Sequence, residues 1–285
     1  MKIIVIVLFL WIFLVFSAES EEVLVNKPQS ENDSRYDYPH KLLEMILKET
    51  TGDYKPASVA HSQFAMTRDR MLLSLIKGDL LHVVAEAPKQ EWLEKLLVVR
   101  IPIRKGIQGY RLFFINKDDQ AVIAKTNSLQ QFMKFPTGSG VGWSTAKIME
   151  NAGFEVVIGN NYDGLFDMLD KKRFLTLGRG VNEIISEYNI QKKFHPNLTI
   201  ESGIAVYIPL PTYFFVSPQK PQLAKRIETG LHKLIEKGKF EQYFLSYHEQ
   251  IIGDTNLKNR KVYSISNPNL SEADPLQDKK LWYRF

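Results

Sequence analysis

The fold is decided by three stretches of the sequence: YRLFFI at residues 110–115, GIAVYIPLP at 203–211 and YFFV at 213–216. Each stretch is rich in aromatic and β-branched residues, which predicts an extended strand. The region between them has its own alternation of strand and helix patterns. The chain therefore runs from one structural unit into a second and back, which predicts an α/β protein of two lobes, the second inserted in the first.

The predicted lobes have definite limits in the sequence. Lobe 1 comprises residues 21–112 and 213–285, and lobe 2 comprises residues 113–212. The two crossover strands, near 110–116 and 205–214, would form the hinge, and the cleft between the lobes is where a ligand is expected. The alternative is one continuous α/β domain without a cleft.

Local patterns fill in both lobes. In lobe 1 we expect a strand at 23–25, helices at 41–50 and 68–77, and a strand at 80–85. In lobe 2 we expect strands at 121–124, 154–158 and 174–177, helices at 145–151 and 164–171, and a glycine-rich loop at 138–142. A further helix is expected to end at Gly238. The tail after Asp254 is polar, ends in aromatic residues, and is expected to wrap across a lobe.

The first twenty residues have the pattern of a secretory signal peptide. Lys2 precedes the apolar run from Ile3 to Phe16, and small residues follow it. This run is shorter than the roughly 20 residues needed to span a bilayer. We therefore expect residues 1–20 to direct export into a periplasm. An uncleaved N-terminal anchor is the alternative.

The composition excludes several classes of protein. The 285 residues include no cysteine, and 37 Lys and Arg face 32 Asp and Glu, a net charge of +5. The sequence therefore predicts no disulfide, no thiol nucleophile, no lipoprotein anchor and no nucleic-acid partner. The six histidines lack metal-ligand spacing, and no G-x-S-x-G motif is present. We expect no metal, no cofactor and no enzymatic activity.

The signal-peptide pattern and five stretches carry a resemblance to a known family: GDLLHVVAEAPKQEW at 78–92, KGIQGYRLFFI at 105–115, FPTGSGVGWSTAKIMENAGFEVV at 135–157, NYDGLFDMLDKKRFLTLGRGVNEI at 161–184, and FVSPQKPQLAKRIETGLHKLIEKGKFEQYF at 215–244. In these and in their order the chain resembles a divergent type II periplasmic solute-binding protein of the amino-acid-binding class, family 3. The resemblance implies a monomer that closes on a small polar or anionic solute. It also implies delivery of that solute to a membrane transporter permease, as in an ABC transporter, or to a membrane sensor.

Arg179 and Glu183 are the leading ligand-binding candidates. Both follow the apolar strand expected at 174–177, and ligands in open α/β sheets lie beyond the carboxyl ends of strands. A guanidinium suits bidentate recognition of a carboxylate. The alternative is a structural salt bridge between Arg179 and Glu183.

The glycine-rich segment 137–144 is the second candidate region. Amides at such a helix entry can bind an anion, and the resemblance implies that this loop holds the ligand carboxylate. The candidates here are Ser139, Gly140, Trp143 and Ser144. A flexible turn is the alternative, and Trp143 is expected either to stack on a ligand or to pack on its lobe.

Further cleft candidates are Tyr36, Glu86, Arg104 and Tyr110. The basic run from Arg100 to Arg111 is expected to be mostly a solvated face. Two positions depart from the resembled class, since no arginine follows Glu86 within residues 86–92 and Arg179 stands near the position where an aspartate is expected. An exported enzyme on the same fold and a structural derivative without a ligand are the rival hypotheses.

Overall fold

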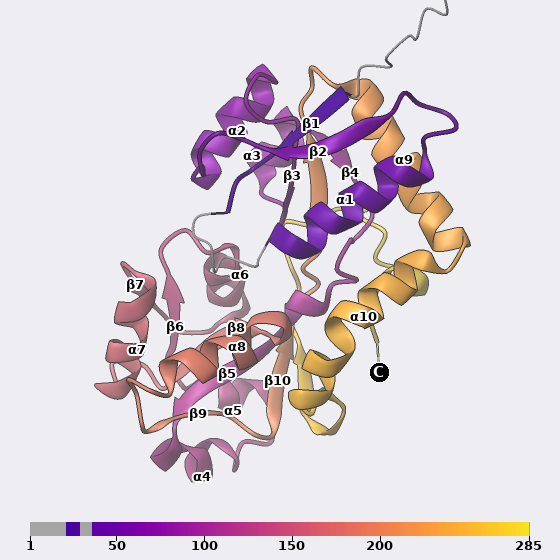
Figure 1. The fold of residues 1–285 in the computed structure, drawn as a ribbon. Coiled ribbons are helices and arrows are strands. Elements are labelled where there is room, and N and C mark those ends of the chain that lie inside the picture. The colour runs from indigo at the N-terminus through magenta and orange to yellow at the C-terminus, as the bar shows by residue number, and fades with distance from the viewer. Residues whose placement is uncertain (1–20, 29–35, 285) are drawn as a thin grey trace, which may run out of the picture.

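The structure, a computed structural model, describes residues 21–28 and 36–284 (Figure 1). The predicted signal peptide lies outside the described residues. Within those residues, none of the helices combines the length and the apolar character that crossing a membrane requires.

The first lobe is built on two small sheets. β3 (Val83–Glu86), β11 (Tyr213–Val216) and β4 (Leu97–Val99) form an antiparallel sheet in the order β3-β11-β4, and β1 (Glu21–Val25) pairs in parallel with β2 (Ala57–His61). Its helices are α1 (Asp37–Glu49), α2 (Arg68–Lys77), α3 (Gln90–Lys95) and α9 (Pro221–Glu236). The apolar faces of α1 and α9 pack together in one core with β1, β3 and β4. The expected helices at 41–50 and 68–77 are confirmed.

The second lobe is built on a larger mixed sheet, seen in the lower half of Figure 1. Its order is β12-β10-β5-β8-β6-β7, with β9 paired to β5. The strands are β5 (Tyr110–Asn116), β6 (Thr137–Gly140), β7 (Val156–Gly159), β8 (Thr176–Gly180), β9 (Leu198–Ile200), β10 (Ile204–Tyr207) and β12 (Lys261–Ser264). The helices are α4 (Gln120–Ile123), α5 (Leu129–Phe132), α6 (Ser144–Ala152), α7 (Tyr162–Asp170) and α8 (Val181–Gln191). All residues of β5 are buried, so this crossover strand is the centre of the lobe.

The two crossover segments lie against each other between the lobes. The Ile208 amide donates to the Gly109 carbonyl at 2.9 Å, and the Ile103 amide donates to the Thr212 carbonyl at 3.0 Å. β5 and β10 then continue into the larger sheet, while β11 returns to the smaller one. The expected two-lobed fold, with an inserted second lobe and a hinge of two crossovers, is confirmed.

The C-terminal region joins both lobes. After α10 (Lys239–Asp254), β12 pairs with β10 in the larger sheet, although we expected everything after residue 212 in lobe 1. The residue limits of the lobes stay a prediction. The tail then crosses the hinge: the Tyr283 amide donates to the Lys105 carbonyl at 2.7 Å, and a side chain at Gly106 would collide with the Trp282 ring.

Two expected elements are wrong. Residues 121–123 belong to the short helix α4, which ends before Ala124, and form no strand, because an apolar run of this length fits either structure. The expected glycine-rich loop is mostly strand β6, and only the turn that follows it is irregular. Its glycines give space to rings, since a Cβ at Gly138 would lie 2.3 Å from Phe174 and one at Gly140 would lie 2.5 Å from Trp143.

Gly109→Ala tests the contact between the crossovers. A Cβ at this position would lie 2.0 Å from the Ile208 carbonyl oxygen, which is backbone and cannot rotate away. Overpacking of this kind costs about 1–3 kcal/mol. We expect the free energy of unfolding in urea to fall by at least this amount. Gly253→Ala, where a Cβ meets open space in α10, is the control and should not destabilise the protein. Equal stability of the two variants would contradict the prediction.

The buried ring of His248 is expected to make the stability of the protein depend on pH. Its ring is 1 % exposed, packs 4.9 Å from the Tyr38 ring and 5.0 Å from the Phe244 ring, and has no hydrogen-bond partner for either nitrogen. Burial, aided by the charge of Arg104, lowers the pKa of His248 to about 3. Below pH ~6.5 the unfolded chain therefore binds a proton at His248 that the folded chain does not bind. The free energy of unfolding then falls by up to about 1.4 kcal/mol for each pH unit.

His248→Leu removes this proton uptake. We expect the variant to lose less stability than the natural chain between pH ~6.5 and pH ~4, measured by urea unfolding at each pH. His232→Leu, at an exposed position of α9, is the control. Parallel pH profiles for the natural chain and His248→Leu would show that His248 does not govern this dependence.

Candidate functional site

A cavity of about 780 Å³ opens between the two lobes. Its walls come from α1, α2 and the end of β3 on one side and from β8, α7 and α8 on the other, with the crossover segments at its base. The lining residues used below are Tyr36, Met66, Arg68, Glu86, Arg104, Gln108, Arg111, Trp143, Tyr162, Arg179, Asn182, Glu183, Glu187 and Thr212.

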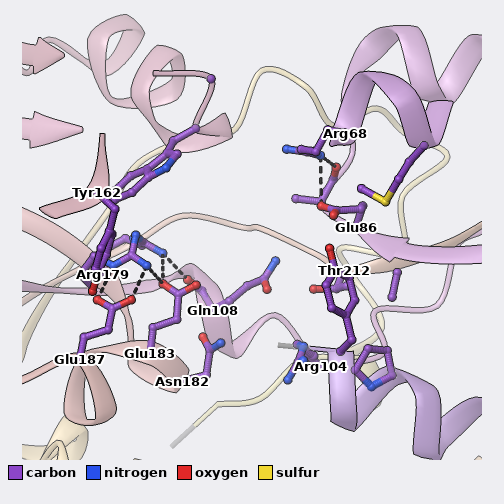
Figure 2. Close-up of a pocket in the computed structure, with 18 of the residues that line it drawn as sticks. Arg68, Glu86, Arg104, Gln108, Tyr162, Arg179, Asn182, Glu183, Glu187 and Thr212 are labelled. Atoms are coloured by element: carbon purple, nitrogen blue, oxygen red, sulfur yellow. Dashed lines mark hydrogen bonds and ion pairs between the residues drawn. The ribbon is translucent and has the colours of Figure 1, made fainter. Parts of the chain in front are cut away.

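An ion network forms the wall of the second lobe (Figure 2). Arg179 lies in β8, and Glu183 and Glu187 lie one turn apart on α8, so both carboxylates face it. Its Nε and Nη2 donate to Glu187 at 2.6 and 2.5 Å, and its Nη2 is 3.3 Å from Glu183. Burial would lower the pKa of Arg179, but the two carboxylates outweigh burial and raise it.

Arg179 therefore forms the salt bridge that was the alternative to ligand binding. It pairs with Glu183, as that alternative required, and more closely with Glu187, which sequence reasoning missed. Arg179 also lies within β8 instead of beyond its end, because the strand runs to Gly180. A ligand that used this guanidinium as its carboxylate clamp would have to compete with two resident carboxylates.

Arg111 supports this network from β5. Its Nη2 donates to the Gly178 carbonyl at 2.8 Å, its Nη1 donates to the Gln108 carbonyl at 3.2 Å, and Nη1 is 3.9 Å from Glu183. Burial lowers the pKa of Arg111 to about 10. The same burial would raise the pKa of Glu183, but Arg179 and Arg111 outweigh it and lower that pKa.

The expectation of a solvated basic face at 100–111 is wrong for most of its charges. Arg104, Lys105 and Arg111 are only 7, 7 and 5 % exposed. These residues belong to the crossover segment, which both lobes cover, so position in the fold overrides the ordinary preference of charge for water. Arg104 lies over the Tyr38 ring at 4.7 Å, and burial lowers its pKa.

The opposite wall carries a second arginine. Arg68 is the first residue of α2, its Nη2 is 3.3 Å from Glu86 at the end of β3, and it donates to the Ala87 carbonyl at 3.0 Å. Figure 2 shows this pair facing the Arg179 network across the cavity. The guanidinium of Arg68 thus lies beside the end of β3, where the resembled class has an arginine, although residues 86–92 contain none.

Several buried polar atoms of the lining have no hydrogen-bond partner. They are Arg68 Nε, Arg111 Nε, Asn182 Oδ1 and Thr212 Oγ1. An unmade hydrogen bond of a buried group costs about 1–3 kcal/mol. All four atoms belong to residues that line one cavity, and each atom is itself covered, so a polar molecule in the cavity could bond to them once the side chains around them move.

The structure separates the predicted site residues into two groups. Those that line the cavity are Tyr36, Glu86, Arg104, Trp143, Arg179 and Glu183. Those outside its lining are Tyr110, Ser139, Gly140 and Ser144. Tyr110 donates to the Tyr283 carbonyl at 3.3 Å, and Ser139 and Gly140 are buried in β6, so of the predicted anion loop only the turn around Trp143 reaches the cavity. A ligand-binding role for any of them stays a prediction.

Residues that sequence reasoning missed include Arg68, Arg111, Tyr162, Asn182, Glu187 and Thr212. The signal of Arg68 and Glu187 was weak, since charged residues at helix starts and on helices usually face water. Among the described residues, no group of three His, Asp or Glu side chains could hold a metal ion.

The sequence matches no family model, and no curated protein matches it significantly. Solved structures do match. A probable amino-acid ABC transporter extracellular-binding protein from Bacillus subtilis superposes with a TM-score of 0.57 at 13 % identity, over 80 % of this chain and 99 % of the other. An arginine 3rd transport system periplasmic binding protein from Legionella pneumophila gives 0.55 at 15 %, over 80 % and 99 %. A histidine kinase sensor domain with similarity to periplasmic binding proteins gives 0.51 at 13 %, over 80 % and 96 %.

At these identities the likeness concerns the fold. The expected resemblance to amino-acid-binding solute-binding proteins is confirmed at this level, and the matched structures are binding proteins and a sensor domain. The chain has the two-lobed fold of type II periplasmic binding proteins.

Proposed function

We propose that this protein is an exported solute-binding protein that closes its two lobes on a small polar or anionic, amino-acid-like solute. The observation that carries the proposal is the interlobe cavity in which four buried polar atoms, Arg68 Nε, Arg111 Nε, Asn182 Oδ1 and Thr212 Oγ1, lack partners. These atoms come from both lobes and from the crossover segments. A ligand that bonded to them would tie the lobes together in the closed state.

The charges of the cavity support a ligand that is not a simple cation. Arg68, Arg104, Arg111 and Arg179 line it together with Glu86, Glu183 and Glu187. The carboxylates of Glu183 and Glu187 are within ion-pair distance of Arg179, and Glu86 is within ion-pair distance of Arg68. A small acid or zwitterion could accept hydrogen bonds from the Nε atoms of Arg68 and Arg111, which have no partner in this structure, once the side chains that cover them move.

Delivery of the solute has two candidate destinations, a membrane transporter and a membrane sensor. Both are represented among the matched structures, by ABC-transporter binding proteins and by the histidine kinase sensor domain. We place the transporter first and the sensor second, with a periplasmic location directed by residues 1–20. We propose no enzymatic activity, because the cavity carboxylates are engaged by arginines instead of facing an open reaction site.

A thermal-shift screen tests the proposal. The mature protein, from residue 21, is heated with amino acids, dicarboxylic acids, short peptides and sugars in separate samples. A bound solute at a hundred times its dissociation constant adds about 2.7 kcal/mol of stability and raises the unfolding temperature. Isothermal titration then gives the affinity. No stabilisation by any member of the panel would contradict solute binding.

Thr212→Val tests whether the buried polar atoms without a hydrogen-bond partner bind the solute. Valine keeps the shape of threonine and removes a buried hydroxyl that has no partner, so the protein should remain as stable as before. We expect the affinity for the solute found in the screen to fall about 2- to 10-fold, the value of one neutral hydrogen bond.

Ser139→Ala is the matched control. Its hydroxyl is also buried without a partner, but it lies in β6 outside the cavity lining. This variant should bind the solute as the natural chain does. Equal affinities for Thr212→Val and the natural chain would remove Thr212 from the site.

A further inference from the structure

The guanidinium of Arg179 has the surroundings of a bound cation. Its central carbon lies 4.3 Å from the centre of the Trp143 ring and 5.8 Å from that of Tyr162. Glu187 accepts two hydrogen bonds from it, and Glu183 stands 3.3 Å away. Aromatic faces and paired carboxylates are the groups that recognise a guanidinium or ammonium ligand. All four of these residues line the cavity.

We propose that Trp143, Tyr162, Glu183 and Glu187 form a cation subsite of the cleft, and that Arg179 occupies it as a tethered guanidinium and so excludes solutes with a basic side chain. This inference rests on the proposed function and narrows it, because it makes Arg179 a specificity-determining residue. The solute class is a small carboxylic acid, or an amino acid whose side chain is neutral or acidic.

The remaining donors of the cavity agree with this class. With Arg179 in place, both α8 carboxylates have a cationic partner. The unpartnered nitrogens of the lining residues, Arg68 Nε and Arg111 Nε, belong to cations on opposite sides of the cavity. An acid group can bond to such donors, whereas a second guanidinium would be repelled by them and would find its subsite filled.

The subsite can be emptied without altering the backbone that carries it. Arg179 is held in β8 by its pairing with β5, where it lies opposite Leu112. The walls come from other elements: Trp143 precedes α6, Tyr162 begins α7, and the two carboxylates belong to α8. Truncation at Arg179 therefore leaves a space the size of the lost side chain, bordered by Glu187 without its cationic partner and by Glu183, which Arg111 still approaches at 3.9 Å.

The test is chemical rescue of Arg179→Ala by ethylguanidinium. We expect the variant to unfold at a lower temperature than the natural chain, because Glu187 loses its cationic partner and Glu183 keeps only Arg111, 3.9 Å away. Ethylguanidinium should raise its unfolding temperature by about 3 °C at ten times the dissociation constant, and should leave the natural chain unchanged. Urea, which has a similar planar shape and no charge, and sodium chloride at equal ionic strength are the controls.

A matched double variant identifies the subsite. In Arg179→Ala/Glu187→Gln the carboxylate that accepts both hydrogen bonds from the guanidinium is gone. We therefore expect at least a tenfold higher ethylguanidinium concentration to be needed for the same rise in unfolding temperature. If Arg179→Ala does not fold alone, recovery of folded protein on refolding with ethylguanidinium replaces the unfolding temperature as the readout.

Several outcomes would overturn the proposal. One is that urea raises the unfolding temperature of Arg179→Ala as much as ethylguanidinium does. Another is that ethylguanidinium stabilises the double variant as well as it stabilises Arg179→Ala. A third is that ethylguanidinium neither raises the unfolding temperature of Arg179→Ala nor improves its refolding. Stabilisation of the natural chain by L-arginine would overturn it as well. The rescue uses a probe cation and not the natural solute, so it stands even if the solute screen fails, and its own failure leaves solute binding intact.

Discussion

The close approach of the two crossover segments is the constraint on which the rest of the molecule depends. The chain passes between the lobes at Gly109 and again at Ile208, and the Ile208 amide bonds directly to the Gly109 carbonyl. A glycine is required because any side chain would meet the backbone of the returning segment. From this point β5 and β10 extend into one sheet and β11 into the other, so the cavity lies where the crossovers hold the two sheets apart.

Burial of charge at the same place gives the cavity its character. The crossover carries Arg104, Lys105 and Arg111 into the interior, and a buried cation is tolerated only where carbonyls, carboxylates or aromatic faces receive it. Arg111 finds the carbonyls of Gln108 and Gly178, and Arg179 beside it finds the carboxylates of α8. Arg104, Arg111 and Arg179 also line the cavity, so the stability of the hinge and the chemistry of the site depend on the same residues.

The sequence predicts the framework better than the site. Helices α1 and α2 could be predicted because their apolar residues repeat at helical spacing and glycines follow them, and β5 could be predicted because it is a buried apolar run. The helix α4 and the strand β12 could not, since each is four residues long and β12 is a strand only because β10 lies beside it.

The site residues divide for a related reason. Glu86 and Arg179 could be placed near the cleft because each comes at or after an apolar run that predicts a strand, and ligands lie beyond strand ends. The two residues belong to different sheets, and each is still within its strand. Arg68 and Glu187 reach the same cavity from helices, and a charge on a helix carries no local sign of the wall that it will face. Glu187 stands eight residues after Arg179, a separation at which no local pattern marks two residues as partners.

The C-terminal tail adds a restraint to the hinge. The Tyr283 amide bonds to the Lys105 carbonyl, and Trp282 packs against Gly106, which has a φ of +65° that glycine adopts readily. Trp282 belongs to the core of the first lobe, while Tyr283 packs on the core of the second. The lobes are therefore linked by the two crossovers and by this tail, seen near the C-terminus in Figure 1. Any rotation that opens the cavity must carry the tail with it or break the Tyr283–Lys105 bond, so the energy of closure depends on residues distant in sequence from those that line the cavity.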